Sequence, residues 1–152
     1  MPLSAPASME KEHQDIWQLL TGVQNLSGKT GSVAEKLVKD LKAHIDKEES
    51  LALPLLGILR DLVNGKLTDA SAKRASSLYV KLEKEYPGML HGHNELYEIL
   101  EKLKKVGAKE GHLTAVRFAE ALEKHSQEEE EVLYPAAILA GRIAAKQAKA
   151  KS

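Results

Sequence analysis

The sequence predicts an all-α protein, built as one antiparallel up-down four-helix bundle with an internal two-fold repeat. Leu, Ala, Lys and Glu dominate its 152 residues, whereas aromatic residues make up only 4% and strand-forming residues are sparse, a composition that favours helices. Apolar residues recur at alternating spacings of three and four, which places them on one face of a helix. A chain of this length buries one sizeable core, so a single domain is expected.

Residues that start and stop helices divide the sequence into four long helices. Residues 1–7 are expected to form a flexible N-terminus, and Ser8 can cap a first helix that runs to about Leu26. A turn over residues 27–31, rich in Ser, Gly and Thr, then leads to Ser32. Because serine is a preferred N-cap, Ser32 is expected to start the second helix.

The second helix is expected to reach about Val63 and to bend at Pro54 on the way. A proline removes one backbone donor and its ring crowds the preceding turn, which bends or breaks a helix. Asn64 and Gly65 follow the last periodic residue, and both residue types favour helix ends.

The third bundle helix is expected to follow an interruption. Thr68 and Asp69 can start further helix that continues to about Tyr86, and the pair at 87–88, Pro and Gly, is expected to break it. Helix then continues to about residue 106. The interruption separates a connecting segment from the helix that belongs to the bundle.

The fourth helix is expected over roughly residues 109–148, with Pro135 inside it. The bundle as a whole is assigned to residues 8–145. The last residues, 146–152, contain Lys at three positions and are expected to form a frayed basic tail, because helix ends fray where little packs against them.

Polar residues interrupt the apolar seam of every helix. The seam of the second helix reads Val33, Leu37, Leu41, His44, Glu48, Leu51, Leu55, Ile58, Leu62. The seam of the fourth reads Phe118, Leu122, His125, Glu129, Val132, Ala136, Leu139, Ile143. His13 and His93 take a seam position in the first and third helices. Burying an unpaired carboxylate or imidazolium is expensive, so these residues need one another or a shared cation.

The two halves of the chain repeat. Residues 13–20 align with residues 93–100 at an offset of 80, with identical or similar residues throughout. At an offset of 81, the His, Glu and Pro of the second helix align with those of the fourth: His44, Glu48 and Pro54 with His125, Glu129 and Pro135. A duplicated helical hairpin predicts approximate two-fold symmetry, with a site on the symmetry axis.

The chemistry that these residues permit is metal binding. A His and a Glu four residues apart lie one turn apart on one helix face, so both can reach one metal or the Glu can bridge two. The predicted ligands are His13, His44, Glu48, His93, His125 and Glu129. Four imidazoles and two carboxylates suit two first-row metals, with iron ahead of manganese or zinc.

The symmetry of the repeat suggests how the ligands divide between the two metals. We expect His13 and His44 on one metal, His93 and His125 on the other, and both glutamates as bridges. A bridging oxo or hydroxo group would add a fifth ligand to each metal. A sixth position then stays open for a small ligand.

Several neighbours of these ligands have more than one interpretation. Trp17 and Tyr97 follow their histidines by one turn and either roof the site or fill core, and Tyr97 can also ligate through its phenolate. Glu49 and Glu130 are either solvated or accept hydrogen bonds from ligand histidines. The two remaining histidines, His91 and His112, are expected on the surface.

Composition and charge exclude several classes of protein. Lys plus Arg and Asp plus Glu both total 22, and this balance disfavours binding to nucleic acid or to an anionic membrane. The absence of cysteine excludes thiolate sites and fits a reducing cytosol. No apolar run approaches 18 residues. A cytoplasmic protein that does not bind membranes is expected.

One His, then His-x-x-x-Glu, then one His, then His-x-x-x-Glu, resembles the hemerythrin family, specifically its HHE cation-binding domains, over about residues 8–143. The resemblance implies a non-haem di-iron centre that binds dioxygen, nitric oxide or peroxide and draws on an electron donor that the motif does not specify. Oxygen-carrying members have a fifth histidine where this chain has Tyr97, and an Asp where it has Glu129. The chain is closer to the four-His, two-Glu centres of iron-sulfur repair proteins, without their Cys-containing extension. A protein that binds or reduces a small oxidant is therefore expected, either as a ligand-binding protein or as a peroxidase-like or oxidase-like oxidoreductase.

Two alternatives come from other classes of protein. A ferritin-like iron oxidase or iron store needs a Glu-x-x-His pair on each of two helices, and only Glu10 and His13 have that spacing. A metal-free helical interaction module would use its buried polar residues to set register. Metal analysis separates the hypothesis of a metal-free module from the hemerythrin-like and ferritin-like hypotheses.

Overall fold

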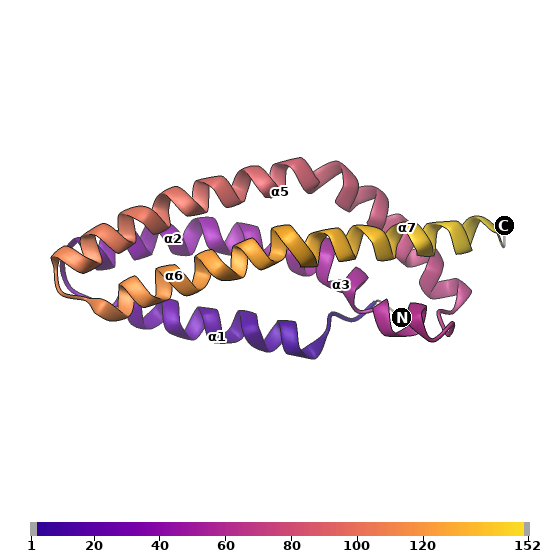
Figure 1. Cartoon of the computed structure of the whole chain (residues 1–152), viewed down its shortest axis with the longest axis horizontal. Helices are drawn as coiled ribbons and strands as arrows, with labels where there is room; N and C mark the ends of the chain where they lie inside the picture. Colours follow the sequence, from indigo (N-terminus) through magenta and orange to yellow (C-terminus); the bar gives the residue numbers. More distant parts are fainter. Residues whose placement is uncertain (1–2, 151–152) are drawn as a thin grey trace.

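The computed structural model describes residues 3–150, and every regular element in that range is a helix (Figure 1). The elements are α1 (Ala7–Gln24), α2 (Gly28–Lys47), η1 (Glu48–Ala52), α3 (Leu53–Leu56), α4 (Leu59–Val63), α5 (Asp69–Lys109), α6 (Leu113–Glu128), η2 (Glu129–Leu133) and α7 (Tyr134–Ala150). The prediction of an all-α protein is confirmed for this part of the chain. Positions 1, 2, 151 and 152 of the predicted N-terminus and tail lie outside the described residues.

Four long helical stretches lie alongside one another. The turn that joins α1 to α2 and the turn that joins α5 to α6 lie at the same end of the molecule (Figure 1). Within this arrangement α2 packs against α1 and α5, and α6 packs against α5 and α1. At the other end α7 packs against α5 and the short helix α3.

The start of α1 differs from the prediction. The helix begins at Ala7 with Pro6 as its N-cap residue, so Ser8 lies inside the first turn and is not the cap. Pro6 has a φ of −59° and has no N–H to satisfy, which suits the start of a helix. Leu3 and Ala5, within the predicted flexible segment, pack against the core.

The start of α2 is also earlier than predicted. The helix begins at Gly28, whereas Ser32 was expected as its cap. The reason is Glu110, whose carboxylate accepts hydrogen bonds from the backbone N–H of Lys29 at 3.0 Å and of Thr30 at 2.8 Å. These bonds satisfy donors that a helix start leaves free. A hydrogen bond from the Thr30 hydroxyl to the same carboxylate, together with these two backbone bonds, holds the pKa of Glu110 at about 2, below its ordinary value.

Proline has a different effect in α5 than predicted. The helix runs without interruption from Asp69 to Lys109 through Pro87, so the expected break at 87–88 is wrong. A proline inside a helix costs about 3 kcal/mol. Leu82 and Met89 on either side of it are 0% and 1% exposed, and burying each such side chain stabilises by about 1.5–3 kcal/mol. This packing outweighs the lost hydrogen bond, and α5 follows a curved path (Figure 1).

The prolines of the repeat follow two π-helical turns. In η1 the N–H of Leu53 bonds to the carbonyl of Glu48, and in η2 the N–H of Tyr134 bonds to the carbonyl of Glu129, five residues back in each case. Pro54 and Pro135 come next. Because a proline cannot donate to the carbonyl four residues back and crowds it, the helix widens there, and each π turn begins at a seam glutamate.

The second helix does not continue as one element to Val63. After η1 it divides into α3 and α4, with Gly57 directly after α3. A Cβ on Gly57 would lie 1.7 Å from the carbonyl oxygen of Ser4. The N-terminal segment therefore approaches the backbone too closely for any residue larger than glycine at this position.

The π turn η2 shifts the apolar seam of the fourth helical stretch by one residue. The predicted seam residues Leu139 and Ile143 are 57% and 46% exposed, whereas Ala140 and Ala144 are buried. One extra residue rotates the following helix by about 100°, so the predicted register is wrong after Glu129. In the second stretch Leu55 and Ile58 are buried as predicted, while Leu51 and Leu62 are half-buried.

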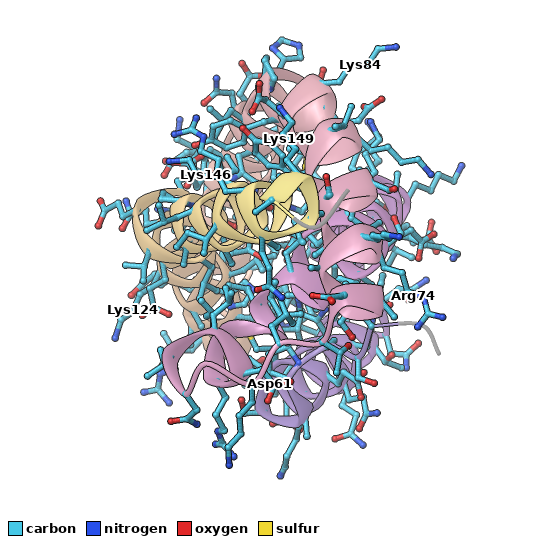
Figure 2. The ribbon with its side chains drawn as sticks, turned by 90° about the vertical axis from the view of Figure 1, so that its right-hand side faces the viewer. Asp61, Arg74, Lys84, Lys124, Lys146 and Lys149 are labelled. Atoms are coloured by element: carbon cyan, nitrogen blue, oxygen red, sulfur yellow. The ribbon has the colours of Figure 1, made fainter. Side chains whose placement is uncertain are left out.

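The surface carries the charged side chains. Figure 2 shows the labelled Arg74, Lys84, Lys124 and Lys146 on the outside of the bundle. The segment predicted as a basic tail from residue 146 is helical as far as α7 extends. Across the described residues, none of the helices combines the length and the apolar character that crossing a membrane requires.

Candidate metal centre

Four helices bring the predicted ligands together at one level. Two apolar clusters fill the bundle: one lies toward the α1–α2 and α5–α6 turns, and the other surrounds α3 and α7. Between them lie His13 of α1, His44 of α2, His93 of α5, His125 of α6, Glu48 of η1 and Glu129 of η2. All six are buried, with exposed fractions of 8% or less. The π turns begin at the two glutamates, so each glutamate is still in helical register with its histidine.

The six residues form two overlapping groups. His13 and His125 belong to one group and His44 and His93 to the other, while Glu48 and Glu129 belong to both. Within each group the ligand atoms lie within 4.8 Å of one another. The predicted pairing of histidines within each half of the chain is therefore wrong. The two-fold repeat permits either pairing. In the structure the ring centres of His13 and His125 lie 5.8 Å apart and those of His44 and His93 lie 4.3 Å apart, which gives the pairing across the bundle.

Each carboxylate extends one oxygen toward each group. Glu48 places Oε1 at 2.8 Å from Nε2 of His44 and Oε2 at 3.8 Å from Nε2 of His13. Glu129 places Oε1 at 3.2 Å from Nε2 of His93 and Oε2 at 3.3 Å from Nε2 of His125. Both glutamates thus span the two groups.

Acidic residues hold the outer nitrogen of three histidines. The Nδ1–carboxylate distances are 3.2 Å for His13 with Glu49, 2.8 Å for His93 with Glu130 and 2.6 Å for His125 with Glu12. A carboxylate accepts a hydrogen bond, so the ring proton lies on Nδ1 and the Nε2 lone pair faces the interior. The interpretation of Glu49 and Glu130 as hydrogen-bond acceptors is confirmed. Glu12 was missed because its partner lies on α6, 113 residues away.

His44 lacks this support. The counterpart of Glu12 in the repeat, at the offset of 80, is Gly92. A Cβ on Gly92 would lie 3.7 Å from Nδ1 of His44, and both residues line a cavity of about 230 Å³ with Asp40 and Lys47. Nδ1 of His44 thus faces a cavity where the other three histidines face a carboxylate.

Tyr134 is a site residue that the sequence reasoning missed. It is 1% exposed, and its Oη lies 3.1 Å from Nε2 of His44 and 3.2 Å from Nε2 of His93. Burial, reinforced by the Glu48 carboxylate, raises the pKa of Tyr134 above its ordinary value. Burial and the neighbouring His44 lower the pKa of His93. No pattern in the sequence places Tyr134 inward, because only η2 turns it toward the histidines.

In the group of His13 and His125, which we call the first group, two buried atoms have no hydrogen-bond partner among the described residues. They are Nε2 of His13 and Oε2 of Glu48. They lie 3.8 Å apart. Because the proton of His13 is directed to Glu49, two lone pairs face each other at this point, and buried unsatisfied polar atoms are costly. A cation between them would satisfy both, so these residues fit a metal ion.

The other predicted neighbours lie beside the two groups. Trp17 lines a cavity of about 490 Å³ together with His13 and Glu49. The ring centre of Tyr97 lies 6.1 Å from that of His93, and its buried hydroxyl has no hydrogen-bond partner among residues 3–150. Burial, followed by the charge of Glu130, raises the pKa of Tyr97 to about 12.

The two remaining histidines are outside both groups. His91 is exposed and lies 3.4 Å from Glu95, and Nε2 of His112 lies 3.2 Å from the carbonyl oxygen of Ser27 in the turn before α2. Comparison with models of protein families, with curated proteins and with solved structures finds no match to this chain.

Proposed function

We propose that this chain is a hemerythrin-like protein, an antiparallel up-down bundle that holds two iron ions and binds or reduces a small oxidant such as dioxygen, peroxide or nitric oxide. The observation that carries this proposal is the pair of buried groups that share Glu48 and Glu129. Two imidazoles and two shared carboxylates per metal match a dinuclear centre better than two independent sites, because neither carboxylate belongs to one group alone.

The donor set favours iron. Imidazole nitrogen and carboxylate oxygen without thiolate suit first-row metals of intermediate character, among which manganese and zinc are the less favoured candidates. Four protein donors in each group leave room for an exogenous ligand. When bound, two ferrous ions supply the two electrons that reduction of an O–O bond requires.

The chain supports such a site by orienting its ligands and by packing apolar side chains around them. Glu12, Glu49 and Glu130 keep the protons of three histidines on Nδ1, which orients their Nε2 lone pairs inward and increases ligand basicity. Apolar clusters pack on both sides of the site. Because Tyr97 stands where an oxygen carrier has a fifth histidine, irreversible reaction with the oxidant is proposed over reversible carriage.

Elemental analysis of protein purified without chelator tests the metal content. We expect two irons per chain in the wild type and fewer than two in Glu48→Ala and Glu129→Ala, because each carboxylate serves both metals. His91→Gln is the matched control and should keep two irons. Two irons in either glutamate variant would reject the bridging role, and absence of stoichiometric metal in the wild type would favour the metal-free interaction module.

Stopped-flow spectroscopy tests the chemistry. Reduced protein is mixed with oxygen, peroxide or nitric oxide, and the gas is then removed. We expect oxygen to give an oxidised state that persists after its removal. Recovery of the reduced spectrum over repeated cycles without added reductant would identify an oxygen carrier and contradict the proposal.

A further inference from the structure

The internal repeat also breaks at the residue that directly follows each π turn. At the offset of 81, Tyr134 corresponds to Leu53. Both residues directly follow a π turn, and both are buried, with exposed fractions of 1% and 2%. At this position, therefore, one half of the chain has a buried phenol and the other half has a buried aliphatic side chain.

The Tyr134 hydroxyl lies closest to the group of His44 and His93, which we call the second group. Its oxygen lies 3.1 Å from Nε2 of His44 and 3.2 Å from Nε2 of His93. In the same group the His44–Glu48 and His93–Glu129 nitrogen–oxygen distances are 2.8 Å and 3.2 Å. Neighbouring donors of an octahedral ion with bonds of about 2.1 Å lie about 3.0 Å apart. The Tyr134 oxygen thus keeps the spacing of a ligand to the same ion.

From this geometry we infer that Tyr134 is a ligand, as its phenolate, of the metal held by His44 and His93, and that the small oxidant binds at the metal held by His13 and His125. This inference rests on the proposed function and adds an asymmetry to it. When the metal binds, the phenolic proton leaves to solvent water and the oxygen lone pair forms the new bond.

The asymmetry follows from the number of protein donors. With the bridging oxo or hydroxo group, the metal of His44 and His93 would then have six ligands, whereas the metal of His13 and His125 would have five, because Leu53 offers no donor atom. The open position thus lies beside His13, which lines the cavity of about 490 Å³ that Trp17 and Glu49 share. A small ligand can approach this group from that cavity.

Visible absorption and resonance Raman spectra of the oxidised iron protein test the ligand. A phenolate bound to ferric iron gives a charge-transfer band in the visible and enhanced phenolate ring vibrations. We expect both in the wild type and in Tyr97→Phe, and neither in Tyr134→Phe, with band intensity compared per iron bound. Tyr134→Phe keeps the ring that fills the core, and its circular dichroism should match that of the wild type.

The outcomes separate this inference from the proposed function. Two irons per chain without a phenolate band, or a band that persists in Tyr134→Phe, would overturn the role of Tyr134 and leave the di-iron proposal standing. A band lost in Tyr97→Phe instead would assign the phenolate to Tyr97. Wild-type protein without iron would refute the proposed function itself.

Titration of the oxidised protein with azide tests the asymmetry by a second readout. We expect one azide per pair of irons in the wild type and two in Tyr134→Phe, where the second metal also has an open position. Tyr97→Phe should bind one. Two azides in the wild type would overturn the inference that Tyr134 closes one metal.

Discussion

Replacing Leu139 by Ala tests the helix register on which the position of Tyr134 depends. The three-and-four seam read from the sequence makes Leu139 a core residue, as it does Leu122. In the structure Leu139 of α7 is 57% exposed and Leu122 of α6 is 2% exposed. The two substitutions remove the same atoms from two stretches of one continuous predicted helix, so Leu122→Ala is a matched control.

The expected losses of stability differ severalfold. Truncating a fully buried Leu to Ala costs about 2–5 kcal/mol, because a cavity adds to the lost transfer free energy. Full burial of a Leu side chain is worth about 1.5–3 kcal/mol, and an exposure of 57% leaves Leu139 roughly two-fifths of that, about 1 kcal/mol. Water fills the space it vacates, so no cavity penalty arises.

Urea denaturation followed by circular dichroism measures both losses at the same metal content. With an m value of about 2 kcal/mol per molar, Leu122→Ala should lower the midpoint by at least about 1 M and Leu139→Ala by about 0.5 M. Ala140, one residue further on, is 1% exposed, and Ala140→Leu should cost about 1–3 kcal/mol by overpacking. A loss in Leu139→Ala equal to that in Leu122→Ala, with Ala140→Leu neutral, would refute the register.

Three further predictions concern charge and the metal. Glu110→Gln should lower the urea midpoint at pH 7. The difference in midpoint from the wild type should narrow as the pH falls from about 4.5 toward 2, because the folded pKa of Glu110 is about 2 and protonation removes its stabilising effect. A difference in midpoint that does not depend on pH would contradict this. Gly92→Glu should supply the carboxylate that His44 lacks and tighten iron binding about tenfold or more relative to Gly92→Ala. Competition with a chelator measures both affinities, and equal affinities would reject His44 as a ligand that a carboxylate at position 92 can support. Chelator should lower the melting temperature, and equal melting temperatures with and without chelator would show that no metal stabilises the fold. The metal-free protein should lose stability as the pH falls below about 6.5. The reason is the lowered pKa of folded His93, because of which the unfolded chain takes up the proton first.

Local spacing is sufficient to predict the class of fold and the six ligand-type residues. A His followed by a Glu four residues later needs only one helical turn to share a face, and the order of the motifs in the repeat predicts that they meet. The structure buries all six together. Glu49 and Glu130 could also be anticipated, because each follows a seam glutamate directly in the chain.

Contacts between distant segments decided the rest. The sequence by itself determined which side chains converge, since helical periodicity is local. The grouping of His13 with His125 depends on how their side chains meet in the packed bundle. Likewise Glu110 accepts a hydrogen bond from the first turn of α2 from 81 residues away, a contact that no local pattern records. A proline favours a π turn, but α5 has none at Pro87, so packing decides where a helix widens. The single extra residue of η2 turns Tyr134 toward the site. Tertiary packing therefore decided that Tyr134 meets the histidines, whereas the sequence decided that its counterpart in the repeat is Leu53.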